Sequence, residues 1–182
     1  MFYWPNKPIR IYDNEKLVNT LPLENWIVQP KWDGKRLEIS CDAEGRLMFF
    51  GRQGQRWASV AEEWGFLVDL HVPKPWFLDG ELLRDGRIFV WDYAQMAGVA
   101  EFRKPYWPRL QFLQENVLPM VVNGHSFSVA ETLQASEYKK LLLREGDPML
   151  EGIVFKSRNA TNLWGPHNTT QVNSQFKYRF KG

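Results

Sequence analysis

The chain has 182 residues, a hydrophobic fraction of 44% and a formal net charge of +2, a composition typical of one ordinary globular domain with a sizeable core. The 23 cationic side chains barely outnumber the 21 anionic ones, so phosphate ligands are compatible but the strongly basic surface of a dedicated nucleic-acid binder is excluded. A single cysteine excludes an internal disulfide, and three scattered histidines argue against a zinc centre. With no signal-like or membrane-spanning apolar run, we expect a cytoplasmic protein of a cell, or of a phage or virus in its host.

Alternating apolar residues and turn signals predict an α+β fold rich in antiparallel strands. In chain order we expect strands at 26–31, 36–41, 46–50, 77–83, 88–94, 126–131, 151–157 and 175–180, with helices at 59–70, 108–118 and 136–144. The first helix is predicted from a capping box formed by Ser59 and Glu62. Asp85-Gly86 predicts the turn of a hairpin. The longest irregular stretch, 158–173, is expected to be mobile.

The segment Lys31-Trp32-Asp33-Gly34-Lys35-Arg36 carries the first chemical signal, because it places a lysine at the end of a predicted strand. A lysine amine attacks phosphorus only when unprotonated, and its ordinary pKa is near 10, so burial or nearby cations must lower that pKa. Arg36 is close enough in sequence to contribute, and Gly34 permits a tight loop near a phosphate. The pattern makes Lys31 a candidate nucleophile.

Two acidic segments follow, and each taken alone has a structural explanation. Asp79 and Glu81 lie in an apolar strand, where Asp79-Gly80 is typical of a β-bulge and Glu81 of a solvated strand residue. Trp91-Asp92 lies in another apolar strand, where an aromatic side chain is usually part of the core.

Two basic segments close the series. Glu151 and Lys156 fall on opposite faces of an ideal strand, so both could serve one ligand only if Glu151 acts from the strand end or a bulge reorients it. Lys177 and Arg179 share one face of the last strand, a pattern that also fits solvated surface.

Taken together and in this order, from Trp26 to Phe180, these segments resemble the motifs of the covalent nucleotidyltransferase superfamily, which includes ATP-dependent DNA ligases, RNA ligases and mRNA capping guanylyltransferases. Gly51-Arg52-Gln53-Gly54 is similar to a further segment of DNA ligases. The resemblance implies an ATP-grasp-related nucleotidyltransferase fold, with residues 1–182 forming one adenylation domain. We expect no OB-fold domain in the sequence, since it ends two residues after the last motif.

The resemblance also implies a role for each motif residue. Lys31 would attack the α-phosphate of ATP to form lysyl-AMP, with Mg²⁺ as the metal. The other catalytic residues would be Glu151, Lys156 and Lys177, with both lysines on the α-phosphate. The nucleotide contacts would be Gln29, Lys31, Arg36, Glu81, Trp91, Lys156 and Lys177, with Trp91 stacking on the base in the place of a phenylalanine. The metal-associated acids would be Glu151 and Glu81, and the contacts to a 5′-phosphate would be Arg52 and Arg36. Arg179 stands in place of a second lysine and stays cationic.

The substrate is expected to be nucleic acid, bound by a monomer. The Asp-Gly-x-Arg form ending in Arg36, together with Arg52, favours a DNA ligase that seals nicks during repair and replication. An RNA ligase is the alternative, followed by a capping guanylyltransferase, a core that needs a partner domain, and a catalytically silent nucleotide-binding module. Gln29 fits adenine or guanine, because its amide both donates and accepts hydrogen bonds.

Overall fold

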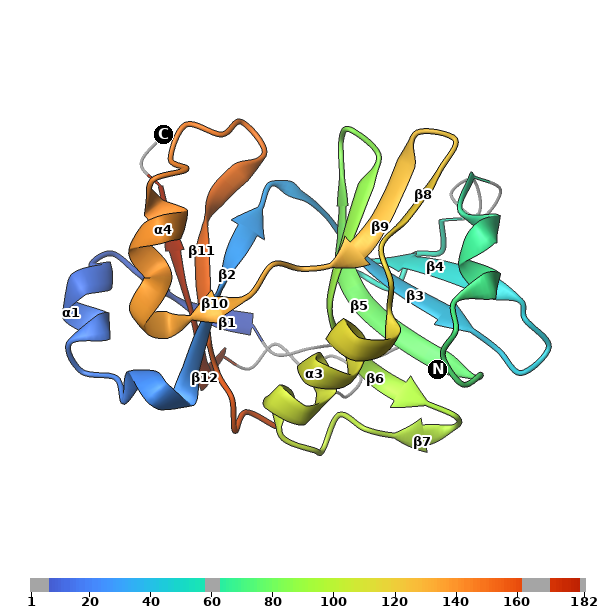
Figure 1. Cartoon of the computed structure of the whole chain (residues 1–182), viewed down its shortest axis with the longest axis horizontal. Coiled ribbons are helices and arrows are strands. Elements are labelled where there is room, and N and C mark those ends of the chain that lie inside the picture. Colours follow the sequence, from blue (N-terminus) through green and yellow to red (C-terminus); the bar gives the residue numbers. More distant parts are fainter. Residues whose placement is uncertain (1–6, 58–62, 162–170, 181–182) are drawn as a thin grey trace. The chain divides into compact units, whose positions relative to one another are not determined.

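The computed structural model describes residues 7–57, 63–161 and 171–180, except for the side chains of residues 171 and 172. These residues form two compact units (Figure 1). Unit 1 contains residues 34–57, 63–104 and 108–129, and unit 2 contains residues 7–33, 105–107, 130–161 and 171–180. The chain therefore passes from unit 2 to unit 1 between Asp33 and Gly34, directly after the candidate nucleophile.

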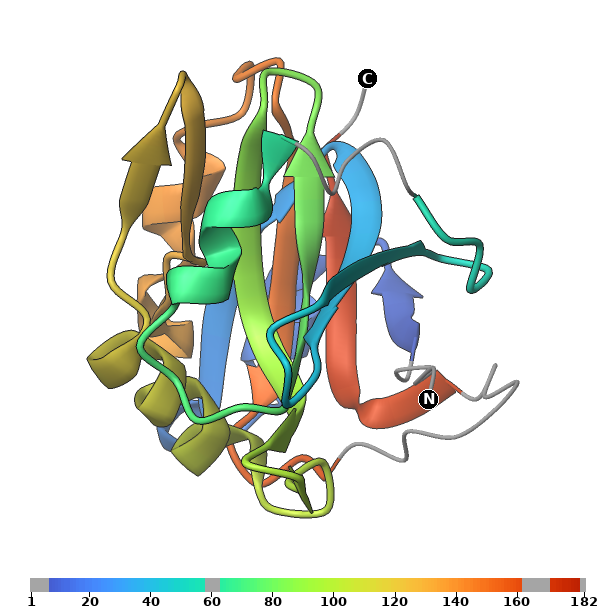
Figure 2. The ribbon, with the colours of Figure 1, turned by 90° about the vertical axis from the view of Figure 1, so that its right-hand side faces the viewer.

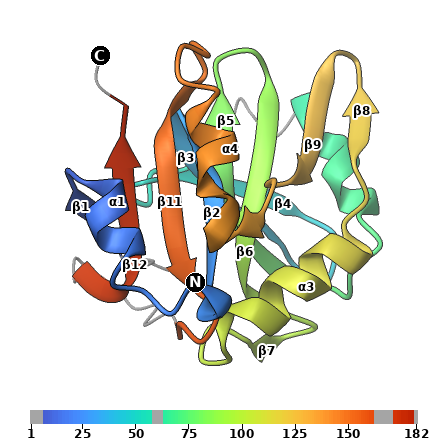
Figure 3. The same cartoon turned by 60° about the vertical axis from the view of Figure 1, so that its left-hand side comes forward.

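Unit 2 is built on a five-stranded sheet in the order β1-β12-β11-β2-β10. The strands are β1 (Lys7–Ile11), β2 (Trp26–Trp32), β10 (Leu133–Gln134), β11 (Leu150–Ser157) and β12 (Gln171–Arg179). β1 is parallel to β12, and the other neighbours are antiparallel. The helical segments are α1 (Asn14–Val18), η1 (Leu23–Asn25), η3 (Ala135–Glu137) and α4 (Tyr138–Leu142). Figure 3 shows α4 lying against β2 and β11.

The hydrophobic core cluster of unit 2 lies on one face of its sheet. Trp26 and Val28 of β2 pack with Ile153 and Phe155 of β11 and with residues of α4. Since side chains alternate between the faces of a strand, the residues between these core positions point to the opposite face. That opposite face carries the polar residues described below.

Unit 1 is built on a seven-stranded sheet with the path β4-β3-β5-β6-β9-β8, and β7 also pairs with β6. The strands are β3 (Gly34–Cys41), β4 (Leu47–Gly51), β5 (Trp76–Leu83), β6 (Arg87–Met96), β7 (Val99–Ala100), β8 (Met120–Val122) and β9 (His125–Val129). The helices are η2 (Gly65–Asp69) and α3 (Tyr106–Asn116), whose first two residues belong to unit 2. The long β5–β6 hairpin is drawn in green in Figure 2.

The unit 1 core combines alternate residues of its central strands with helical residues. Leu37 and Leu78 are fully buried in the sheet, and Leu113 and Val117 of α3 pack in the same cluster. The sequence spaces Leu110, Leu113 and Val117 on one face of the helix expected at 108–118, and Leu110 is also buried. The amphipathic pattern at 108–118 therefore predicted the helix correctly, although α3 begins two residues earlier.

The expected strands all occur, with ends shifted by a few residues. Sequence reasoning missed β1, α1, β7, β8 and β10. Ser59 and Glu62 lie outside the described residues, and 65–69, the later part of that expected helix, is a 3₁₀ helix. β12 begins at Gln171, so the irregular stretch is shorter than 158–173, and its residues 162–170 lie outside the described part. No helix in the described ranges is long and apolar enough to cross a membrane.

Candidate active site

The register of the unit 2 sheet gathers most of the basic motif residues on one face. Between β2 and β11, Lys31 pairs with Gly152 and Gln29 pairs with Val154. Between β11 and β12, Gly152 pairs with Arg179, Val154 with Lys177, and Lys156 with Gln175. Directly paired residues of neighbouring strands share a face. The side chains opposite the apolar core, here called the polar face, therefore include Gln29, Lys31, Lys156, Gln175, Lys177 and Arg179.

Glu151 reaches the polar face because β11 contains a bulge. Leu150 pairs with Trp32 and Gly152 with Lys31, so Glu151 is the extra residue. Its Oε1 contacts Lys31 Nζ and lies 3.3 Å from Arg179 Nη2. In an ideal strand, Glu151 and Lys156 would lie on opposite faces. The bulge turns the Glu151 side chain to the face that carries Lys156.

Gly152 makes the bulge possible. Its φ is +155°, and a Cβ atom at this position would lie 2.0 Å from the carbonyl oxygen of Tyr178 and 2.9 Å from Arg179 Cα. No side chain larger than hydrogen fits between these backbone atoms. The Glu151-Gly152 pair is therefore required by backbone geometry as well as by charge.

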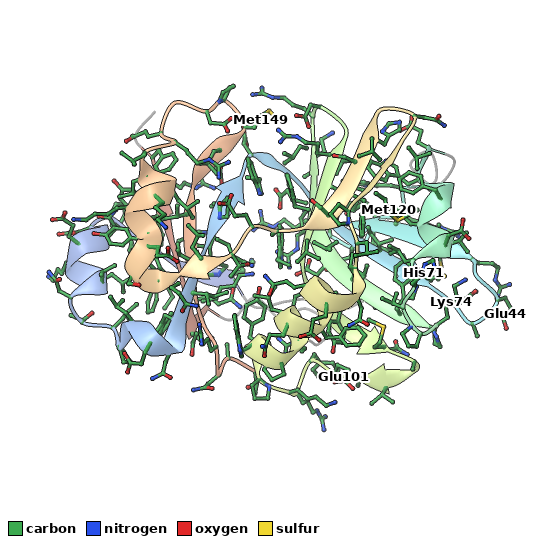
Figure 4. All side chains as sticks on the ribbon, viewed as in Figure 1. Glu44, His71, Lys74, Glu101, Met120 and Met149 are labelled. Atoms are coloured by element: carbon green, nitrogen blue, oxygen red, sulfur yellow. The ribbon has the colours of Figure 1, made fainter. Side chains whose placement is uncertain are left out.

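Lys31 lies one residue before the end of β2, with a side chain that is 21% exposed. The backbone after it is held by the N–H of Asp33, which donates to the carbonyl of Met149 at 2.9 Å. Met149 precedes β11 and is labelled in Figure 4. Lys31 is thus partly accessible at the end of β2. The residue Asp33 that follows β2 is fixed to the start of β11, the strand that carries Glu151.

Gln29 and Lys156 are buried and linked through a tyrosine. Tyr106 OH lies 3.3 Å from Gln29 Oε1, and Lys156 Nζ lies 3.2 Å from the same hydroxyl. Gln29 Nε2 donates to Thr132 Oγ1 at 2.8 Å. The relative exposures of Gln29 and Lys156 are 2% and 7%, so these polar groups need the partners that this network supplies.

In unit 1, Asp79 joins two of the predicted nucleotide-binding residues. Its carboxylate accepts hydrogen bonds from Arg36 Nε and Nη2 and, at 2.9 Å, from Trp91 Nε1. The Arg36 guanidinium carbon lies 5.0 Å from the centre of the Trp91 ring, within cation–π range. Burial lowers the pKa of Arg36, but the charges of Asp79, Glu38 and Glu81 outweigh it, so the pKa rises above its ordinary value.

The register between β5 and β6 shifts at Asp79-Gly80, where a bulge was expected, but the extra residue lies on β6 and not in Asp79-Gly80. Asp79 pairs with Asp92 and Gly80 with Val90, which leaves Trp91 as the extra residue. Asp92 is buried and accepts hydrogen bonds from Arg109 Nε and Nη2 at 2.8 and 3.0 Å. The two acids of the Asp79 and Asp92 segments thus fix an arginine each, one on β3 and one on α3.

The remaining predicted residues are distributed between the units. Glu81 pairs with Arg36 on the unit 1 sheet. Arg52 is exposed in the turn after β4, where the N–H of Gly54 donates to the carbonyl of Gly51. Glu151 belongs to unit 2 and Glu81 to unit 1. Among the described residues, no three His, Cys, Asp or Glu side chains form a group that could hold a metal.

Sequence reasoning missed the partners Tyr106 and Thr132, and it assigned Asp79 only to a bulge. A usable signal existed for Asp79, because a carboxylate between Leu78 and Gly80 in an apolar strand needs a buried cationic or N–H partner. No comparable signal exists for Tyr106 and Thr132, which lie 77 and 103 residues from Gln29.

No protein-family model and no curated protein matches the chain. Solved structures do match. The ligase domain of LigD from M. tuberculosis matches with a TM-score of 0.70 and 18% identity, over 96% of this chain and 59% of the LigD domain. The chain has the nucleotidyltransferase fold of ATP-dependent DNA ligases.

Other structures with this ligase fold agree. A mycobacterial DNA ligase D complexed with ATP matches with a TM-score of 0.70 and 19% identity, over 96% of this chain and 60% of that one. An archaeal ATP-dependent RNA ligase matches with a TM-score of 0.59 and 16% identity, over 95% of this chain and 47% of the RNA ligase chain. The chain thus spans about 60% of the length of the LigD structures and less than half of the RNA ligase. The α+β nucleotidyltransferase fold expected from the motifs is confirmed.

Proposed function

We propose that the chain is an ATP-dependent polynucleotide ligase that first transfers AMP to Lys31. The observation that carries the proposal is the polar face of unit 2, where Lys31 contacts Glu151 and shares the face with Lys156, Lys177 and Arg179. A face on which these cations outnumber the carboxylate suits a polyanionic ligand, and the fold is one used by ATP-dependent ligases.

In the first step, the Lys31 amine loses a proton and attacks the α-phosphorus of ATP. A P–N bond forms, the bond to the bridging oxygen breaks, and pyrophosphate leaves. Glu151 contacts Lys31 Nζ and can accept the departing proton. Lys156 and Lys177 stabilise the negative charge that develops on the phosphoryl oxygens.

Glu151 is the residue of this face that would hold Mg²⁺, since magnesium prefers carboxylate oxygens and retains water and phosphate ligands. When bound, the ion would neutralise charge on the triphosphate. Glu81 stays a proposed metal-associated or ribose-contacting residue of unit 1.

In the later steps, AMP passes to a 5′-phosphate, and a 3′-hydroxyl then displaces it. We propose nicked DNA as the substrate. Arg36 and the exposed Arg52 are offered as the contacts to the 5′-phosphate, which a guanidinium can bind through two hydrogen bonds. Gln29 and Trp91 are assigned to the base, with Trp91 as the stacking ring.

An RNA ligase is the second candidate, favoured by the similarity to the archaeal RNA ligase. The test is to incubate the full chain with ATP, Mg²⁺ and matched nicked substrates made of DNA or of RNA. Faster sealing of DNA supports the proposal, and faster sealing of RNA selects the second candidate.

Lys31→Ala should abolish sealing of every substrate. Lys140→Ala removes an exposed lysine of α4 and should seal like the wild type. Labelling with GTP in place of ATP would assign the chain to capping chemistry. Adenylylated protein that seals nothing would show a core that needs a partner.

A further inference from the structure

The hydrogen bonds around Gln29 form a continuous chain whose direction is fixed at both ends. At one end is Lys156, whose ammonium group can only donate. Tyr106 OH, 3.2 Å from Lys156 Nζ, therefore accepts from it. The hydroxyl hydrogen of Tyr106 is then directed to Gln29 Oε1, 3.3 Å away.

At the other end is a backbone carbonyl, which can only accept. Thr132 Oγ1 donates to the carbonyl oxygen of Ala130 at 3.1 Å. A hydroxyl has one hydrogen to donate, so Thr132 must accept from Gln29 Nε2 at 2.8 Å. The two ends agree, and together they fix which way the Gln29 amide points.

The oriented amide explains why glutamine suits this position. A glutamate has no N–H group, so it could not donate to Thr132 while Thr132 donates to Ala130. Each amide atom of Gln29 also has a second bonding site, a lone pair on Oε1 and a hydrogen on Nε2. An acceptor beside a donor complements the edge of adenine formed by its 6-amino group and N1.

Tyr106 is held firmly enough to impose this arrangement. It is 2% exposed, and the next residue, Trp107, donates its backbone N–H to the carbonyl of Arg158 at 2.9 Å. The Arg158 guanidinium carbon lies 4.1 Å from the Trp107 ring centre. The start of α3 is thereby fixed to the residue that follows β11, the strand that carries Lys156.

We propose that Tyr106 is a positioning residue that holds the Gln29 amide in the orientation that selects the base. The inference rests on the proposed function. The Tyr106 hydroxyl, which accepts from the Lys156 ammonium, donates to Gln29 Oε1 and so fixes the amide in one orientation. Without the hydroxyl, the amide loses its acceptor-side anchor and can rotate, and the lysine loses a hydrogen bond.

The test compares Tyr106→Phe with the wild type in single-turnover protein adenylylation. The probes are ATP and purine riboside triphosphate, which lacks the 6-amino group. We expect the rate with ATP to fall about tenfold, as for loss of a hydrogen bond to a charged group. We also expect the preference for ATP over the purine analogue to shrink, because a merely destabilised protein would lose rate equally with both nucleotides.

Tyr138→Phe is the matched control. Tyr138 is a buried tyrosine of unit 2 that packs on Phe155 across the apolar face, with ring centres 5.9 Å apart. Tyr138→Phe should keep the adenylylation rate and the preference for ATP of the wild type. Thr132→Val provides a second variant that removes the other anchor of the amide, and it carries the test if Tyr106→Phe does not fold. It should reduce the preference with a smaller loss of rate.

Three outcomes separate this inference from the proposed function. A reduced preference in Tyr106→Phe or Thr132→Val, with Tyr138→Phe unchanged, supports the positioning role. Adenylylation with the preference unchanged in both variants overturns the positioning role and leaves the ligase proposal standing. A wild-type chain that forms no adduct overturns both.

Discussion

The two sheets follow the same plan, an apolar face over a core and a polar face opposite, but they use charge differently. In unit 1 the cation Arg36 is bound by buried Asp79, with Glu38 and Glu81 contributing further negative charge. In unit 2 the cations exceed the acids, since Glu151 shares the polar face with Lys31, Lys156, Lys177 and Arg179.

This difference separates a cation held by a buried acid in unit 1 from a face of unit 2 on which cations outnumber acids. A buried pair such as Arg36–Asp79 contributes structure, and breaking it by removing one partner is costly. Neighbouring cations in excess repel one another, and binding of an anion should relieve the repulsion. The unit 1 charges should therefore appear in unfolding measurements, and the unit 2 charges in rates.

The largest expected effect comes from Gly152→Ala, because the added Cβ would lie 2.0 Å from the carbonyl oxygen of Tyr178. The bulge would have to open, at a cost of more than about 3 kcal/mol in the free energy of unfolding. Denaturant titration measures this loss. Gly65→Ala is the control, since a Cβ there meets nothing within 4 Å. Equal stabilities of the two variants would contradict the assigned bulge.

Asp79→Ala should come next, because it leaves Arg36 without its carboxylate and the Trp91 N–H without its acceptor. We expect a loss of about 2 kcal/mol in the free energy of unfolding, reduced from the value for a fully buried pair because Arg36 is 25% exposed. The exposed pair of Glu44 and Arg46 provides the control, and Glu44→Ala should change stability little. A harmless Asp79→Ala would remove the structural role from the unit 1 charges.

Lys177→Ala should show the opposite behaviour in unit 2. We expect adenylylation to slow by roughly ten- to a hundredfold, the effect of losing one stabilising group for a developing anion. The melting temperature should change less than in Asp79→Ala, because Lys177 lies among other cations. Single-turnover labelling with ATP and thermal melting test both halves of the prediction, and an unchanged rate would refute the role of Lys177.

The smallest effect concerns Tyr93 in the unit 1 core, where burial raises its pKa to about 12. Above about pH 10 this tyrosine ionises in the unfolded chain but stays protonated in the folded one. The contribution of Tyr93 to the free energy of unfolding is therefore intact below pH 10 and is lost as the pH rises toward 12. Between pH 10 and 11, the free energy of unfolding of Tyr93→Phe should fall by about 1 kcal/mol less than that of the wild type. Parallel stability curves for the two proteins would contradict this.

Sequence reasoning found the elements that are defined by local pattern. Alternation located β2, β3, β5, β6 and β11, and the apolar spacing of Leu110, Leu113 and Val117 located α3. Gly34 was explained only as a loop residue. In the structure an added Cβ at Gly34 would lie 2.6 Å from the carbonyl oxygen of Leu82, so glycine also permits close pairing of β3 with β5.

The rest depended on contacts between distant parts of the chain. Short edge strands such as β1 and β10 have too few residues for a periodic pattern, and they form because a partner strand lies beside them. The bulge at Glu151 was one of two alternatives, and only the register with β2 decides between them. Tyr106 joins Gln29 to Lys156 through tertiary contacts that no local pattern encodes.

The central claim is that the polar face of unit 2 makes Lys31 a covalent nucleophile toward ATP. Intact-mass measurement after incubation with ATP and Mg²⁺, followed by peptide mapping, tests it most directly. We predict one AMP-sized adduct on Lys31 that is absent in Lys31→Ala and retained in Lys140→Ala. An unmodified wild-type protein, or an adduct on another lysine, would contradict the claim.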